Sequence, residues 1–227
     1  MPVADHRDRS ANPPAPGSPN RVRQSPNRAL YDRDALDAVL DAANVGHVAF
    51  VHEGRPVSIP TAVARLDDAL YLHGLRSARM YDTLAGGAPA CVSVCLVDGL
   101  VKARSAFHCS MNYRSAVVHG TCTAVTGEDL VPVLDRMTER LIPGSAGDFR
   151  EHLPKELRAT LLLALPLDTW AVKVRDDGPV DDEEDLGLPH WAGVVPIVSR
   201  HLPPVPAPDL PDGIAAPRGL GGEPVGP

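Results

Sequence analysis

The sequence predicts a mainly β fold with inserted helices (α+β), in which short antiparallel strands close a small barrel. Six or more short apolar runs rich in β-branched residues follow one another closely, and dipeptides typical of turns separate them. Helical patterns are inserted among these runs without regular strand–helix alternation, and no Gly-x-Gly-x-x-Gly pattern occurs. Both observations argue against a doubly wound dinucleotide-binding domain.

The first half of the chain is predicted to contain two helices and three strands. Residues 33–46 carry Leu36, Val39 and Leu40 at helical spacing, and Gly46 ends the pattern. A shorter helix over residues 77–87 also ends at a glycine. The predicted strands, separated by Glu-Gly and Asp-Asp turns, cover residues 47–52, 55–66 and 69–74.

The second half is predicted to add further strands and two helices. The Asp98-Gly99 pair lies between two apolar runs, residues 88–99 and 100–107, and is a strong hairpin signal. Pro132 has to lie near the start of a helix over residues 127–142. The remaining elements are a helix over residues 155–165, which stops before Pro166, and strands over residues 115–126, 169–175 and 190–198, the last of which closes the core.

Both ends of the chain are rich in proline. Residues 1–28 hold six of the 24 prolines, and residues 202–227 hold eight. Neither end has apolar periodicity, so we expect disordered or extended polyproline segments. The predicted organisation is one folded domain over residues 29–200, between an N-terminal tail (1–28) and a Pro-rich C-terminal tail (201–227).

The net charge of −7 is concentrated in one segment, residues 176–185, which holds seven acids and no base. We expect this segment to be a solvated loop or a partner for basic residues of another subunit. No basic face is apparent, which argues against nucleic acid as a partner. The sequence has no apolar run of about 18 residues, so no membrane span is expected.

The N-terminal sequence lacks the apolar centre of a signal peptide, so we expect a cytoplasmic protein. The four cysteines fit that compartment as reduced thiols. Neither a Cys-x-x-Cys nor a His-x-x-x-His pair occurs, and no metal site is predicted.

Residues 103–120, ARSAFHCSMNYRSAVVHG, gather many hydrogen-bonding side chains between two apolar runs. Lys102 and Arg104 alternate onto one face of the strand predicted over residues 100–107. One interpretation is a ligand or subunit contact, and the other is a hydrogen-bonded loop that ties two strands together. The donors that follow are His108, Asn112, Tyr113 and Arg114.

Several ordered segments of the chain match one known family. The segments are VGHVAFV (45–51), IPTAVAR (59–65), LYLHG (70–74) followed by SARM (77–80), LVKARSAFHCSMNYRSAVVHG (100–120) and VDDEEDLGLPHWAGVVP (180–196). Together they resemble the pyridoxamine 5′-phosphate oxidase-like flavin-binding split barrels, and most closely the nitroimidazole reductase-like subgroup. The resemblance implies a six-stranded antiparallel split barrel and a homodimer with FMN in the groove between subunits. The chain lacks the C-terminal Arg-His-rich substrate motif of true pyridoxamine phosphate oxidases, so we do not expect vitamin B6 synthesis.

The resemblance also suggests which residues hold the flavin. Arg76, Ser77 and Arg79 lie where a strand runs into a helix, and there they can bind the phosphate. The family usually has Ser directly before the Arg, a place taken here by Ala78. Thr61, after Pro60 on the preceding strand, is a candidate contact of the flavin ring. A solvated helix cap and a structural threonine are the alternatives.

The remaining candidates lie elsewhere in the chain. Lys102 and Arg104 would add positive charge towards the phosphate or the flavin, and Tyr113 and Arg114 would meet substrate or the other subunit. Trp191 would stack on the flavin or pack against the protein. His73 and His119 are either structural or potential haem ligands, because a single histidine is enough to ligate haem iron.

The sequence thus predicts a homodimeric FMN-dependent oxidoreductase. It would pass electrons from NAD(P)H to a small oxidised organic molecule, for example a nitro compound. The flavin performs the hydride chemistry, so no catalytic side chain is assigned. Deazaflavin or haem are alternative cofactors, and a haem- or flavin-binding carrier or sensor without turnover is the alternative function.

Overall fold

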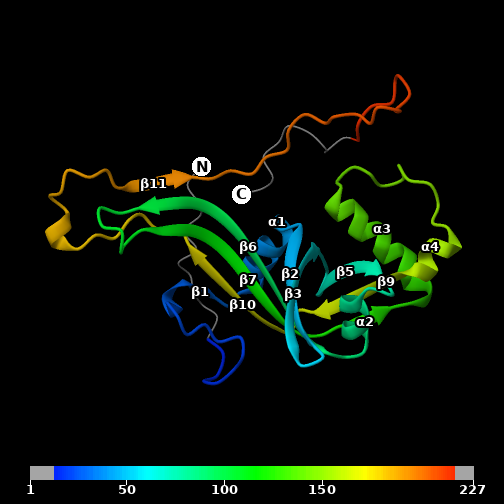
Figure 1. Ribbon diagram of the computed structural model, residues 1–227, viewed down its shortest axis with the longest axis horizontal. Coiled ribbons are helices and arrows are strands. Elements are labelled where there is room, and N and C mark those ends of the chain that lie inside the picture. Colours follow the sequence, from blue (N-terminus) through cyan, green and yellow to red (C-terminus); the bar gives the residue numbers. More distant parts are fainter. Residues whose placement is uncertain (1–12, 218–227) are drawn as a thin grey trace.

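The computed structural model describes residues 13–217, which form two antiparallel sheets with helices beside them (Figure 1). The larger sheet has the strand order β1-β10-β7-β6-β2-β3, with β11 paired to β6, and the smaller has the order β4-β5-β9-β8. The predicted mainly β class with helices is confirmed. The strands are β1 (Ala29–Leu30), β2 (Val45–His52), β3 (Arg55–Ala62), β4 (Ala64–Leu66), β5 (Ala69–Leu75), β6 (Pro89–Lys102), β7 (Ser110–Thr121), β8 (Thr123–Val125), β9 (Thr160–Pro166), β10 (Thr169–Arg175) and β11 (Gly193–Pro196).

The described residues contain more strands than the predicted six, because short strands add to the sheet edges. The α-helices of this region are α1 (Arg33–Ala42), α2 (Arg79–Ala85), α3 (Leu130–Leu141) and α4 (Pro154–Ala159). The Asp32 carboxylate caps α1 by accepting the backbone N–H of Ala35 at 2.8 Å. Pro132 lies in the first turn of α3, as expected. Within residues 13–217, no helix has the length and hydropathy needed to cross a bilayer.

Two groups of buried apolar side chains stabilise the fold. The first includes Val48 and Val118 from the larger sheet and Leu72 from the smaller, so it joins the two sheets. The second lies under α3 and includes Leu134 and Met137. Burial of an aliphatic side chain of this size stabilises the folded state by about 1.5–3 kcal/mol relative to exposure.

The helix predicted over residues 155–165 is wrong from Thr160 onward, where the chain forms β9. This strand lies between β5 and β8 and has apolar side chains on both faces. Leu161 and Leu163 belong to the first core and Leu162 to the second. A strand buried on both faces has a continuous apolar run, which periodicity alone cannot distinguish from a buried helix.

The hairpin turn predicted at Asp98-Gly99 is also wrong. β6 continues through it with a register shift between Val97 and Gly99, and the chain reverses only at residues 103–109. A Cβ atom on Gly99 would lie 3.1 Å from the Val195 carbonyl oxygen, so the glycine allows close approach of β11. The strand predicted to close the core over residues 190–198 is this β11, which pairs with β6 outside both cores.

The outer half of the β6–β7 hairpin (residues 97–113) and β11 are called the arm below. Figure 1 shows the green hairpin extending well away from the helices, with β11 along one edge. β6 and β7 pair from Pro89 with Thr121 to Val101 with Ser110. The arm is therefore a continuation of the larger sheet.

The predicted tails, residues 1–28 and 201–227, lie partly outside the described part of the chain, which omits residues 1–12 and 218–227. The Asn20 side-chain amide donates a hydrogen bond to the Trp170 carbonyl at 3.0 Å. The described N-terminal segment thus contacts β10. Residues 201–216 are exposed.

Candidate functional site

Five of the sequence-predicted site residues lie where β3 and β5 end and α2 begins. Thr61 is at the end of β3, His73 is near the end of β5, and Arg79 is the first residue of α2. Arg76 and Ser77 lie in the turn between β5 and α2. The structure thus brings together the residues predicted to hold the flavin phosphate and one side of its ring.

The sequence prediction missed Tyr81, which connects two parts of this cluster. Its hydroxyl donates a hydrogen bond to the backbone carbonyl of His73 and lies 3.3 Å from the Thr61 Oγ1. Burial raises the pKa of the Tyr81 phenol, so this group remains a protonated donor at neutral pH. The sequence did contain a signal for this contact. Tyr81 lies among apolar residues of a short predicted helix, and a buried tyrosine hydroxyl needs a hydrogen-bond partner.

The arginines of the cluster have different surroundings. The backbone N–H of Arg76 donates to the Ala159 carbonyl at 2.8 Å, and its guanidinium donates to the Thr160 carbonyl at 3.3 Å. Arg79 is exposed, and within residues 13–217 neither Arg79 nor Ser77 has a side-chain hydrogen bond or ion pair. These two side chains are therefore available to a ligand.

His73 lies on the opposite face of β5 from Leu70 and Leu72, which belong to the first core. Its side chain reaches the surface, but the surrounding protein desolvates the ring enough to lower the pKa of the imidazole. The ring is therefore neutral at pH 7, the form that binds a metal ion.

The remaining predicted residues lie on the arm, where most of them have partners in their own chain. Lys102 donates to the Trp191 carbonyl at 2.9 Å. Arg104 pairs with Asp181 at 2.8 Å, and Arg114 pairs with Asp98 at 2.9 Å. Trp191 is 58% exposed.

The acidic segment holds the end of the arm. The Asp181 side chain is almost fully buried and accepts hydrogen bonds from Arg104, and Asp182 lies 3.0 Å from His108. Hydrogen bonds from Arg104 lower the pKa of Asp181, although burial alone would raise it. The segment is thus a partner for basic residues of its own chain.

The buried guanidinium of Arg175 orders the start of this segment. It donates to the Asn112 side-chain oxygen and to the carbonyls of Asp177 and Gly178. Desolvation lowers the pKa of Arg175. The segment 103–120 therefore consists of a strand and a loop, both hydrogen-bonded to their own chain.

The candidate residues form two groups, which lie apart from each other within a single copy of the chain. In Figure 1, α2 lies on the opposite side of the molecule from the arm. The first group surrounds the start of α2, and the second group, Lys102, Arg104, Tyr113, Arg114 and Trp191, lies on the arm.

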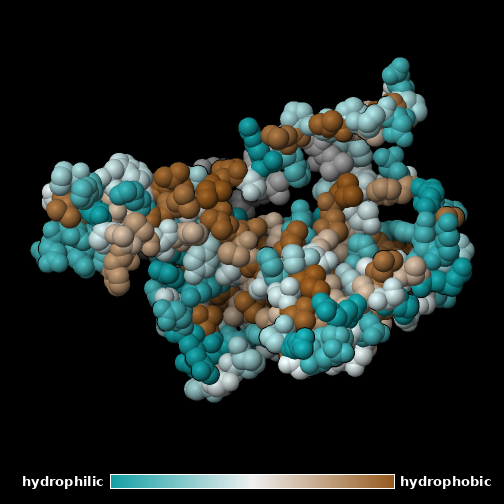
Figure 2. Space-filling model, viewed as in Figure 1, coloured by the Kyte–Doolittle hydropathy of each residue, from teal (hydrophilic) through white to brown (hydrophobic). Residues whose placement is uncertain are grey.

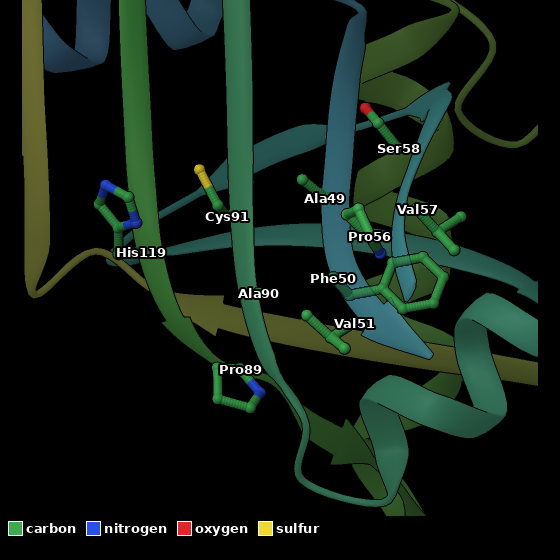
Figure 3. A pocket seen from close by; sticks show the side chains of 10 residues that line it. All are labelled: Ala49, Phe50, Val51, Pro56, Val57, Ser58, Pro89, Ala90, Cys91 and His119. Atoms are coloured by element: carbon green, nitrogen blue, oxygen red, sulfur yellow. The ribbon is translucent and has the colours of Figure 1, made fainter. Parts of the chain in front are cut away.

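A shallow cavity of about 450 Å³ lies on the larger sheet, over β2, β3, β6 and β7. His119 and Cys91 line it from neighbouring strands, and Figure 3 shows their side chains extending to the same side of the sheet. Ala49 and Val51, on the same face of β2, add apolar surface to the lining. Burial raises the pKa of the Cys91 thiol, so it is a poor nucleophile at neutral pH.

Comparison with known families identifies the chain's relatives. The model of the pyridoxamine 5′-phosphate oxidase family matches residues 32–174, which is more than half of the chain and includes the whole cluster around α2. The chain belongs to this family. A search of curated proteins found no match.

Two solved structures resemble the chain along nearly all of its length. The FAD- and haem-binding protein of Mycobacterium smegmatis is 38% identical, with 88% of this chain and 100% of that chain covered and a TM-score of 0.84. The flavocytochrome Anf3 of Azotobacter vinelandii is 35% identical, with 91% and 96% covered and a TM-score of 0.85.

A third structure shares the fold at greater distance. A candidate 5-nitroimidazole antibiotic resistance protein of Bacteroides thetaiotaomicron is 20% identical, with 64% of this chain and 86% of that chain covered and a TM-score of 0.55. This similarity supports the predicted split-barrel fold of the family and does not extend to substrate.

Proposed function

We propose that this protein is a flavin-binding oxidoreductase that passes electrons from a reduced nicotinamide nucleotide to a second molecule. The observation that carries the proposal is the similarity, along nearly the whole chain, to an FAD- and haem-binding protein and to a flavocytochrome. The bound flavin would supply hydride and single-electron transfer. The protein would bind it, orient it and exclude water from it.

The residues around α2 fit a flavin nucleotide. Arg79 and Ser77 have free donors at the surface, and a guanidinium can donate two parallel hydrogen bonds to a phosphate. Thr61 would lie on the ring side of this site, and its hydroxyl is 3.3 Å from that of Tyr81. FMN and FAD carry the same phosphate next to the ribityl chain, so these residues fit either nucleotide. A small oxidised organic molecule, such as a nitro compound, is the proposed electron acceptor.

A second candidate function is haem binding, either beside the flavin or in a carrier or sensor without turnover. The observation that favours it is again the pair of haem-binding relatives. His73 and His119 fit an axial ligand, because neither imidazole has a hydrogen-bond partner within residues 13–217 and both lie on strands, His73 on β5 and His119 on β7. Burial keeps the His73 ring neutral.

Cofactor titration tests both candidates. Full-length protein is stripped of cofactor and titrated with FMN, FAD or haem, and binding is followed by absorbance and native mass spectrometry. We expect a flavin complex whose absorbance near 450 nm bleaches with NADH or NADPH in the absence of oxygen, about one flavin per chain. Failure to bind either flavin would contradict the first candidate. A Soret band that is unchanged in both His73→Ala and His119→Ala would reject these ligands.

We further propose that the working form is a homodimer in which the arm of one copy completes the flavin site of the other. Apolar side chains form a row across the arm, where Leu100 pairs with both Met111 and Val195. They are 46%, 52% and 49% exposed, respectively. Figure 2 shows hydrophobic side chains gathered over β11 and the neighbouring hairpin. Such a row on an extended arm is typical of a protein–protein contact.

A further inference from the structure

Tyr81 occupies a junction between the two sheets. It is the third residue of α2, its side chain is 6% exposed, and it belongs to the first core. Its hydroxyl contacts His73 of the smaller sheet and Thr61 of the larger sheet. One phenol group thus connects the ends of β3 and β5.

The strand pairing explains why β5 needs this hydroxyl. β4 pairs with β5 only as far as Tyr71, so from His73 onward this edge of β5 has no strand partner. The carbonyl of His73 instead accepts the hydrogen bond from Tyr81. A backbone carbonyl in such a partly buried place is costly to leave without a donor.

Gly74 fixes the position of the Tyr81 ring. A Cβ atom on Gly74 would lie 2.2 Å from Cε2 and 2.5 Å from Cζ of that ring. The ring therefore lies against the bare backbone of β5, in space that any other residue would fill. The phenol is held at its face by Gly74 and at its hydroxyl by His73 and Thr61.

The turn that follows β5 carries the groups assigned to the flavin phosphate. Arg79 lies two residues before Tyr81 on the same helix, and Arg76 lies two residues after Gly74. Two backbone hydrogen bonds order this turn, from Arg76 N–H to the Ala159 carbonyl and from Ala78 N–H to the Leu75 carbonyl. A shift of the Tyr81 ring would therefore move both arginines relative to Thr61.

We infer that Tyr81 is a positioning residue for the phosphate-binding turn, where its hydroxyl sets the distance between Arg79 and the flavin-ring contacts at Thr61. The inference rests on the proposed flavin binding. Tyr81 would not contact the phosphate itself. Its loss should weaken recognition of the phosphate without weakening contacts to the ring.

The test compares FMN with riboflavin, which has the same ring and no phosphate. Tyr81→Phe should raise the Kd of FMN roughly tenfold, the scale of one hydrogen bond, and leave the Kd of riboflavin unchanged. Tyr71→Phe is the matched control, because Tyr71 lies on β5, the strand that Tyr81 contacts, is partly buried, and makes no side-chain hydrogen bond within residues 13–217. This variant should bind both ligands like the wild type.

Hydrogen exchange of the ligand-free protein gives a second, independent readout. The amides of Arg76 and Ala78 should exchange faster in Tyr81→Phe than in the wild type or in Tyr71→Phe. Should Tyr81→Phe not fold, Gly74→Ala displaces the same ring and should give the same selective loss of FMN.

The possible outcomes separate the inference from the function. A wild-type protein that binds neither ligand contradicts the proposed function, and amide exchange then decides the role of Tyr81. A wild-type protein that binds FMN, with equal affinity and equal exchange in Tyr81→Phe, overturns the inference and leaves the function standing. Equal loss of FMN and riboflavin would also overturn it, because the hydroxyl would then support the ring contacts.

Discussion

Arg104 holds Asp181 through two hydrogen bonds, one from its backbone N–H at 2.6 Å and one from its guanidinium at 2.8 Å. The carboxylate is 2% exposed and its pKa is lowered by these donors. The pair joins the acidic segment to the end of the arm. Arg104 and Asp181 are far apart in sequence, so the hydrogen bonds between them close a long loop of the chain.

We predict that Asp181→Asn loosens the end of the arm in a pH-dependent way. A carboxylate with a lowered folded-state pKa contributes stability above its unfolded pKa of about 4, and this is lost as the pH falls through the folded value. The melting temperature of the variant should therefore be below that of the wild type at neutral pH, and the difference should shrink as the pH falls below the unfolded-state pKa of about 4. Asp182→Asn should have a smaller effect on the melting temperature, because the Asp182 side chain is exposed where it contacts His108. A difference that is constant from neutral to acid pH would contradict this prediction.

Gly74→Ala should destabilise the fold by about 1–3 kcal/mol, because the new methyl group overlaps the buried ring of Tyr81. Urea unfolding measures the change as a lower midpoint with an unchanged slope. Gly187→Ala is the control, since a Cβ atom there meets nothing within 4 Å. Equal stability of the two variants would show that the ring moves aside without cost.

Arg79→Ala should weaken FMN binding by about one to two decades in Kd, the loss of a charge-assisted hydrogen bond of roughly 1.5–3 kcal/mol. Isothermal titration with FMN measures the effect. Arg55→Ala removes another exposed arginine, at the start of β3, and should leave the Kd unchanged. If Arg79→Ala binds FMN as tightly as the wild type, the phosphate site lies elsewhere.

Met111→Lys should dissociate the proposed dimer and release flavin with it, since a charge would enter the apolar row of the arm. By the same linkage, FMN should stabilise the wild-type dimer as its concentration rises above its Kd. Analytical ultracentrifugation with flavin absorbance follows both quantities. Val205→Lys, at a 91% exposed tail position, is the control. A Met111→Lys monomer that keeps its flavin would contradict a site shared between copies.

Regular periodicity predicted much of the fold correctly. Leu36, Val39 and Leu40 identified α1 because one face of that helix is buried. The strands that alternate between core and surface, such as β2 and β10, were also predicted near their observed bounds. Periodicity failed at β9, because its side chains enter both cores and neither face is polar. The turn signal failed at Gly99, because this glycine is needed for the close approach of β11 and not for a turn.

The candidate site was predicted less completely than the fold. Local sequence suggested the turn around Arg76 and Arg79, because a polar strand end followed by a helix start is visible in one short segment. Tyr81 could not be predicted as a link to Thr61, since that contact depends on how two sheets meet. The partners of Arg104 were equally hidden, because Asp181 lies far along the chain.

The pairing of β5 with β9 has a consequence for synthesis on the ribosome. Ala69 pairs with Pro166, so roughly a hundred further residues must be synthesised after β5 before its main partner strand, β9, is complete. At roughly 5–20 residues per second, that delay is about 5–20 s, during which Leu70 and Leu72 have no complete core to enter. The β6–β7 hairpin can form within this interval from neighbouring sequence alone. A chain arrested before Thr160 would therefore present a formed hairpin beside an apolar strand that lacks its main partner, a species that chaperones bind and that aggregates without them.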